Sequence, residues 1–119
     1  MDDRPEPSRR GSPRYPTRYP VDGASLDPPA EFRGILCDLS VNGCQLHLDR
    51  RIPPGTAIEA RCNIEGLGLR IRGEVVWGEA VTGGFLHGVV ITGPASEEDA
   101  LFHRLYIERR ARRRHEGAG

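Results

Sequence analysis

Residues 58–77 read IEARCNIEGLGLRIRGEVVW, and their apolar side chains recur at every second position. Before Glu65-Gly66 the apolar set is Ile58, Ala60, Cys62 and Ile64, and after it the set is Leu67, Leu69, Ile71, Val75 and Trp77. A period of two indicates β-strands with one face turned toward a core, and Glu-Gly between two such runs favours a turn. The stretch therefore predicts two antiparallel strands joined as a hairpin.

The same alternation continues on both sides of this hairpin. The apolar positions are Cys44, Leu46 and Leu48 on one side, and Phe85, Val89 and Ile91 on the other. Residues 17–24 (TRYPVDGA) predict a first strand, which we expect at an edge because edge strands tolerate a residue such as Pro20. About six short strands separated by turn residues predict an all-β fold, a small antiparallel barrel or sandwich.

The C-terminal part changes to a helical period. Ser96 followed by Asp99 resembles a capping box. Beyond it a stripe suited to closing one end of a barrel is formed by Leu101, Phe102, Leu105 and Tyr106. The run Arg109–Arg114 fits a solvated helix end, and it also fits a contact with nucleic acid or an anionic membrane. Both interpretations of the run stay open.

Composition restricts the chain to one domain of ordinary size. The sequence has 119 residues, zero net charge and 17 basic residues, all of them Arg. Residues 1–30 hold most of the ten prolines and predict a flexible arm. The division that we expect is an arm at 1–16, a barrel with its terminal helix at 17–108, and a basic tail at 109–119. No run reaches the length of a membrane span and no signal peptide is apparent, so we expect a cytoplasmic protein.

The chain carries no pattern typical of an enzyme. Its three cysteines, Cys37, Cys44 and Cys62, lack metal-like spacing, and at least two read as small buried thiols. The four histidines are scattered, and neither a nucleophile elbow nor a phosphate loop is present. Trp77 is interpreted as a core or rim residue. We therefore expect no catalysis, no metal and no cofactor.

Two short stretches point to a ligand instead. Residues 9–16 read RRGSPRYP and residues 38–43 read DLSVNG. With strands that read GEVVWGE and LHGVVI and a final helix, they resemble the PilZ family, whose motifs are R-x-x-x-R and [D/N]-x-S-x-x-G. The resemblance covers about residues 9 to 106. It implies a six-stranded antiparallel β-barrel with a C-terminal α-helix that acts as a bacterial receptor for cyclic di-GMP and signals to an unidentified downstream protein.

The resemblance assigns ligand binding to Arg9, Arg10, Arg14, Asp38, Ser40 and Gly43. Both Arg10–Arg14 and Arg14–Arg18 satisfy R-x-x-x-R, and we favour the first, which leaves Arg18 on a strand facing solvent. In the family an additional Arg before the motif, here Arg9, accompanies capture of two stacked ligands. We expect Asp38 and Ser40 to lie in a polar turn, away from the buried positions.

Elementary chemistry agrees with these assignments. Arg pairs with phosphate and with the N7 and O6 acceptors of guanine, whereas a carboxylate accepts from guanine N1–H and N2–H. The alternatives are an arm whose arginines only keep it solvated, an ordinary hairpin at Asn42-Gly43, and a PilZ-like scaffold that binds proteins but no nucleotide. Zero net charge and few aromatic residues on the strands argue against a nucleic-acid binder.

Overall fold

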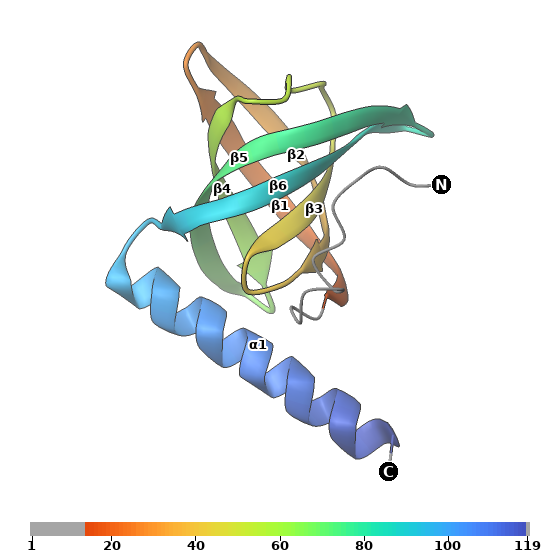
Figure 1. The fold of residues 1–119 in the computed structure, drawn as a ribbon, viewed down its shortest axis with the longest axis vertical. Coiled ribbons are helices and arrows are strands. Elements are labelled where there is room, and N and C mark those ends of the chain that lie inside the picture. Colours follow the sequence, from red (N-terminus) through yellow and green to blue (C-terminus); the bar gives the residue numbers. More distant parts are fainter. Residues whose placement is uncertain (1–13, 119) are drawn as a thin grey trace.

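Six strands are followed by one helix in the computed structural model, which describes residues 14–118, with side chains described through Arg112. In chain order the elements are β1 (Tyr15–Leu26), β2 (Pro29–Leu39), β3 (Gly43–Leu48), β4 (Ala57–Ile64), β5 (Leu67–Val81), β6 (Gly84–Pro94) and α1 (Glu97–Ala118). Figure 1 shows the strands wrapped around one another, with α1 lying along one end of them.

The strands form a closed antiparallel barrel in the order β1-β2-β3-β6-β5-β4, and β1 pairs again with β4 to complete the circle. The predicted six-stranded antiparallel barrel with a C-terminal helix is therefore confirmed. Closure also corrects one expectation, because β1 is not an edge strand. Pro20 is tolerated for a local reason: it pairs with Ile35 of β2, whereas the pairing with β4 begins only at Val21.

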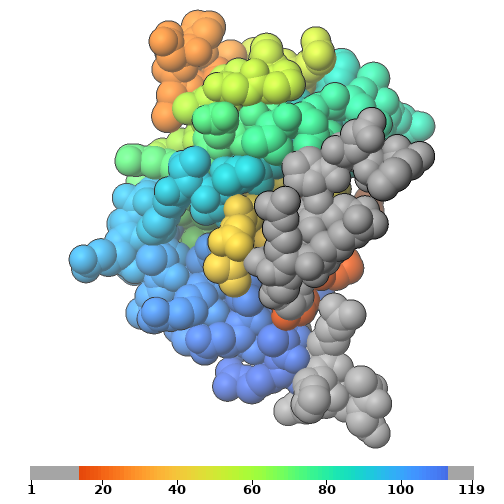
Figure 2. Space-filling model, viewed as in Figure 1, coloured from red at the N-terminus to blue at the C-terminus, as the bar shows by residue number. Residues whose placement is uncertain are grey.

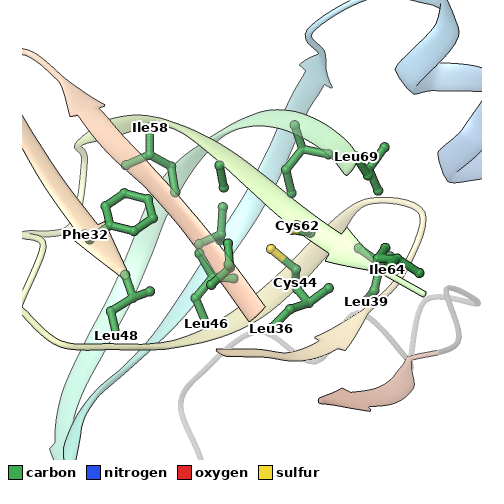
Figure 3. Close-up of a cluster of buried hydrophobic side chains, with 14 of the residues drawn as sticks. Phe32, Leu36, Leu39, Cys44, Leu46, Leu48, Ile58, Cys62, Ile64 and Leu69 are labelled. Atoms are coloured by element: carbon green, nitrogen blue, oxygen red, sulfur yellow. The ribbon is translucent and has the colours of Figure 1, made fainter. Parts of the chain in front are cut away.

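The inward-facing positions of every strand meet in one core (Figure 3). Its largest fully buried aliphatic and aromatic side chains are Phe32, Leu36, Leu39, Leu46, Leu48, Ile58, Ile64, Leu69 and Ile71. Cys44 and Cys62 are buried among them, as predicted, and burial raises the pKa of Cys62 to about 12. His87 shares this inward phase and is also fully buried, which the sequence analysis did not anticipate.

The β4–β5 hairpin turns at Glu65 and Gly66, and both have positive φ, 54° and 88°. Two consecutive positive φ values are what a type I′ turn requires, and this turn matches the twist of the strands beside it. Leu67 follows directly and pairs with Ile64, so it keeps the inward phase. The expectation that Leu67 joins the core is nevertheless wrong, since it is 60% exposed and lies past the last core layer.

Helix α1 begins at the predicted capping box. The Asp99 N–H donates to Ser96 Oγ (3.2 Å), the Ser96 hydroxyl donates to Asp99 Oδ2 (2.6 Å), and Asp99 Oδ1 accepts from the N–H of Arg70 (2.8 Å). The predicted apolar stripe is only partly right. Tyr106 is buried together with Ile107, but Leu101 and Leu105 are nearly half exposed, because the helix turns a neighbouring face toward the barrel.

Candidate functional site

The two strand ends that carry the motifs are both irregular. In β1 the register shifts between Pro16 and Tyr19, and in β2 it shifts between Leu36 and Asp38. Leu36 and Leu39 are both fully buried although three positions separate them. The additional residue, Cys37, makes a β-bulge, and a bulge redirects the side chains beside it. Asp38 is thereby taken out of the inward phase that strict alternation would give it.

Arg14 and Asp38 meet in this region. Arg14 Nη1 donates to Asp38 Oδ1 at 2.8 Å, and the two side chains are 23% and 15% exposed. Arg14 precedes β1, and β1 pairs with β2 so that Pro16 lies opposite Asp38. The two motifs, separate in the sequence, therefore form one ion pair at the surface of the barrel.

The carboxyl group of Asp38 depends on a cation. Burial raises its pKa above the usual range, and the guanidinium of Arg14 counteracts this only in part. An acidic group that burial discourages from ionising gains free energy from any donor placed against it. The site thus offers one cation and one carboxylate side by side, each able to bind the complementary edge of a polar ligand.

Ser40 organises the turn that follows β2. Its hydroxyl and its N–H both lie against the carbonyl oxygen of Gly43, at 3.1 and 2.9 Å, and the N–H of Gly43 lies 3.1 Å from Ser40 Oγ. The Ser40 side chain is fully buried. The expectation that it lies away from the buried positions is therefore wrong, since these hydrogen bonds draw it inward. The backbone carbonyl oxygen of Asn42 accepts from the N–H of Ile91 at 2.8 Å, and this hydrogen bond holds the turn against β6.

Gly43 is required by a close approach of two backbones. A Cβ at this position would lie 2.8 Å from the carbonyl oxygen of Val89 on β6, closer than Cβ atoms in proteins come to other atoms. Gly43 is not needed for a positive φ, because among the described glycines only Gly55, Gly66 and Gly83 have one. The close approach at Gly43 is therefore to the adjacent strand, β6.

Helix α1 contacts this turn directly. His103 Nε2 lies 2.9 Å from the carbonyl oxygen of Ser40, so the ring donates its N–H to that oxygen. Burial lowers the pKa of His103, and this hydrogen bond opposes the shift only in part. Figure 2 shows the turn, in yellow, at the surface beside the blue helix. A displacement of the turn would therefore strain or break this hydrogen bond to α1.

A second contact joins α1 to the beginning of β1. Arg110 donates to the carbonyl oxygen of Pro16 (3.0 Å) and to the hydroxyl of Tyr106 (2.8 Å). Its guanidinium lies 5.8 Å from the ring centroid of Tyr15 and 5.9 Å from that of Tyr106, within the range of cation–π attraction. Tyr19 packs edge-on against Tyr106 with centroids 6.2 Å apart.

Sequence reasoning missed this role of Arg110. It treated residues 109–114 as one run, whereas the described side chains divide: Arg109 and Arg112 are exposed and Arg110 is half-buried. The only signal was the spacing of four residues between Tyr106 and Arg110, which places them on one helix face. Helix α1 also continues to Ala118, through the residues assigned to a tail. The division of the chain at 108 stays a prediction.

The structure brings Arg14, Asp38, Ser40 and Gly43 together at one end of the barrel. Arg9 and Arg10 lie outside the described residues. Arg18 is an exposed residue of β1, as predicted. Trp77 is half-buried, and its ring lies over Gly88 of β6, where an added Cβ would meet it.

Neither a metal-binding group nor a membrane-spanning helix is present in the described part of the chain. Over residues 14–112, whose side chains are described, no three His, Cys, Asp or Glu side chains are grouped closely enough to hold a metal ion. Between residues 14 and 118 no helix has the length and the apolar character to cross a membrane.

Comparison with known proteins identifies one family. The model of the PilZ domain matches residues 8–108, which include both motifs and all six strands. A search of curated protein sequences returns no match.

Solved structures share the fold at low sequence identity. The PilZ domain of YcgR from Escherichia coli, solved with c-di-GMP, is 16% identical with a TM-score of 0.68, over 92% of this chain and 97% of that one. The PilZ domain of CeSA from a cellulose-synthesizing bacterium is 19% identical with a TM-score of 0.61, over 81% and 95%. The Bacillus subtilis inhibitor of motility MotI/DgrA is 12% identical with a TM-score of 0.71, over 91% of this chain and 52% of that one.

Proposed function

The chain belongs to the PilZ domain family, and on that premise we propose that it is a receptor for cyclic di-GMP that works by binding and not by catalysis. One observation carries the proposal: Arg14 of the first motif and Asp38 of the second form an ion pair at 2.8 Å. A single ligand can therefore engage both motifs at once. The bacterial setting, the cytoplasmic location and the downstream protein partner belong to the same proposal.

Guanine suits this pair because it carries complementary edges. A ligand that draws Arg14 away leaves a carboxylate that burial already disfavours, so Asp38 needs a new donor. Guanine N1–H and N2–H supply such donors, while N7 with O6, or a phosphate, accepts from Arg14. Adenine lacks O6 and the N2 amino group and cannot replace both contacts. The site should therefore prefer a guanine nucleotide over an adenine nucleotide.

The roles of Ser40 and Gly43 follow from their positions, whereas those of Arg9 and Arg10 follow from the arginine motif. Ser40 and Gly43 hold the turn at the correct distance from β6, so they support the ligand site through the backbone. We take Arg9 and Arg10 to supply further cations to the bound ligand. We take the arm to fold over the nucleotide, and Arg9 to serve a second, stacked molecule of the ligand.

Isothermal titration of the full chain with cyclic di-GMP tests the proposal. We expect saturable binding of cyclic di-GMP, and binding of cyclic di-AMP at least about tenfold weaker because one bidentate contact is lost. Two ligands per chain, reduced to one in Arg9→Ala, would assign the second molecule to Arg9. No heat of binding at high micromolar ligand would contradict the receptor function and favour a protein-binding scaffold.

Limited proteolysis tests the folding of the arm separately. Trypsin cleaves after arginine, and Arg9 and Arg10 are natural reporters, whereas Arg14 is already paired with Asp38 without ligand. Protection of these sites only in the presence of cyclic di-GMP is the expected result. Equal cleavage with and without the nucleotide would contradict the arm mechanism while leaving binding itself intact.

A further inference from the structure

Three exposed leucines from two distant parts of the chain gather in one groove. Leu101 and Leu105 of α1 are 47% and 46% exposed, and Leu67 at the start of β5 is 60% exposed. All three line a groove of about 830 Å³ between α1 and the β4–β5 hairpin, here called the leucine groove. Phe102 and Tyr106 contribute to its lining from the side of the helix.

The leucine groove is separate from the ligand site. His103 and Arg110 reach the two motif segments, and neither lines the groove. Single exposed leucines are ordinary on protein surfaces, whereas several gathered in one hollow mark a contact surface. Of the exposed large hydrophobic residues among the described side chains, these three share one hollow.

The charged residues of α1 that line the groove have opposite signs at the two ends of the helix face: Glu98 lies near its start, and Arg109 and Arg112 lie farther along. Asp99 and Arg70 also line the groove, but they pair with each other at 3.5 Å, and Glu65 contributes from the hairpin. Leu105 lies seven residues from both Glu98 and Arg112, which is close to two helical turns in each direction. The acid, the leucine and the base therefore follow one another along one face of α1, with the leucine in the middle.

This pattern is complementary to itself when reversed, and we propose that the leucine groove binds a second copy of the chain. Two α1 helices that lie antiparallel, with the twofold axis at Leu105, place Glu98 of each copy opposite Arg112 of the other. The same surface is then used twice, as a twofold interface requires. A parallel arrangement would set like charges against each other. In this dimer the leucines form the buried part of the interface, and the charges determine that the two α1 helices run antiparallel.

Sedimentation of the full chain without nucleotide, from micromolar to millimolar protein, tests the proposal. We expect a monomer–dimer equilibrium, and Leu105→Glu should raise the dissociation constant at least about tenfold because it places two carboxylates at the centre of the interface. Leu26→Glu is the matched control: Leu26 is 52% exposed and lies outside the groove, so dimerisation should be unchanged. Circular dichroism checks that both variants are folded.

Charge reversal tests the antiparallel geometry. Glu98→Arg alone and Arg112→Glu alone should each weaken the dimer, and the double variant should restore it, because the two charges exchange places. A wild-type chain that is monomeric at every concentration overturns the proposal. This holds even if a different protein is found to bind the leucine groove. A dimer that persists in Leu105→Glu also overturns it. None of these outcomes depends on cyclic di-GMP.

Discussion

Arg14 and Asp38 are 24 positions apart in the sequence and 2.8 Å apart in the structure. Each belongs to a different motif, and each neutralises the other when no ligand is present. The barrel makes this contact by pairing β1 with β2 and by bulging both strands beside it. A ligand that binds here has to exchange this internal pair for two contacts of its own.

Replacement of Arg14 by Ala should weaken the binding of cyclic di-GMP. Loss of one bidentate contact costs roughly 1–3 kcal/mol, or about 5- to 150-fold in Kd. Titration calorimetry measures the effect. Arg18→Ala is the control, since Arg18 is exposed on β1, and an equal loss in that variant would show that the second register of the arginine motif is the functional one.

Asp38 and Ser40 should separate in their effects on stability. Asp38→Ala removes an acceptor from the ligand site and leaves Arg14 free to turn to water, so affinity falls while the melting temperature changes little. Ser40→Ala leaves the N–H of Gly43 without the Ser40 hydroxyl in a buried turn, which costs about 1–3 kcal/mol of unfolding free energy. Urea unfolding distinguishes them, and an equal loss of stability in the two variants would contradict these roles.

Gly43→Ala should destabilise the domain by about 1–3 kcal/mol, because the new methyl group meets the carbonyl oxygen of Val89 and forces β3 and β6 apart. Gly93→Ala on β6 is the matched control, since nothing lies within 4 Å of its Cβ position. Urea unfolding of both variants provides the comparison. If Gly43→Ala is as stable as the wild type, β3 and β6 are not tightly held at this point.

Acidification should destabilise the fold through its buried histidines. Burial lowers the pKa of His103 and of His87, so the unfolded chain binds more protons than the folded one as pH falls below the ordinary histidine pKa of about 6.5. The melting temperature should therefore drop between about pH 7 and about pH 5. His103→Gln should reduce the dependence of the melting temperature on pH and leave the part that is due to His87. If the variant and the wild type show the same dependence on pH, His103 does not contribute to the acid destabilisation.

Thiol labelling should count one reactive cysteine in the folded protein. Cys44 and Cys62 are buried, and burial raises the pKa of both thiols, whereas Cys37 is half-buried at the β2 bulge. A chromogenic disulfide reagent at mildly alkaline pH should modify Cys37 slowly, because burial raises the pKa of its thiol too. Denaturant should expose all three. Rapid reaction of three thiols in the native state would contradict the buried arrangement.

Local patterns were sufficient to predict most of the barrel. Period two identified the strands, Glu65-Gly66 identified a hairpin, and Ser96 with Asp99 identified the start of the helix, since each depends on neighbours in the sequence. The same patterns failed where a contact with a distant part of the chain decides which side chains are buried. Leu101 and Leu105 fit a helical stripe as well as Tyr106 does, and only packing against the barrel selects the face that is buried.

The candidate site likewise has features that the sequence predicts and features that depend on distant contacts. Both motifs are legible in the sequence, but nothing at Cys37 marks the bulge that redirects Asp38, and Ser40 looked like a surface hydroxyl. Arg110 could not be told from its neighbours, because its partners, Pro16 and Tyr15, lie more than ninety positions away. Contacts of that range depend on the closed barrel, which no short window of sequence contains.

Closure of the barrel also restricts how another protein can bind this domain. Along the closed barrel each strand pairs on both sides, and among the described residues only stretches near strand ends, such as 77–81 of β5, pair on one side alone. Addition of a foreign strand to the sheet, a common way of binding a small β-domain, is thereby limited to these short stretches. Elsewhere on the domain a partner has to bind side chains, on the turns at the ends of the barrel and along α1.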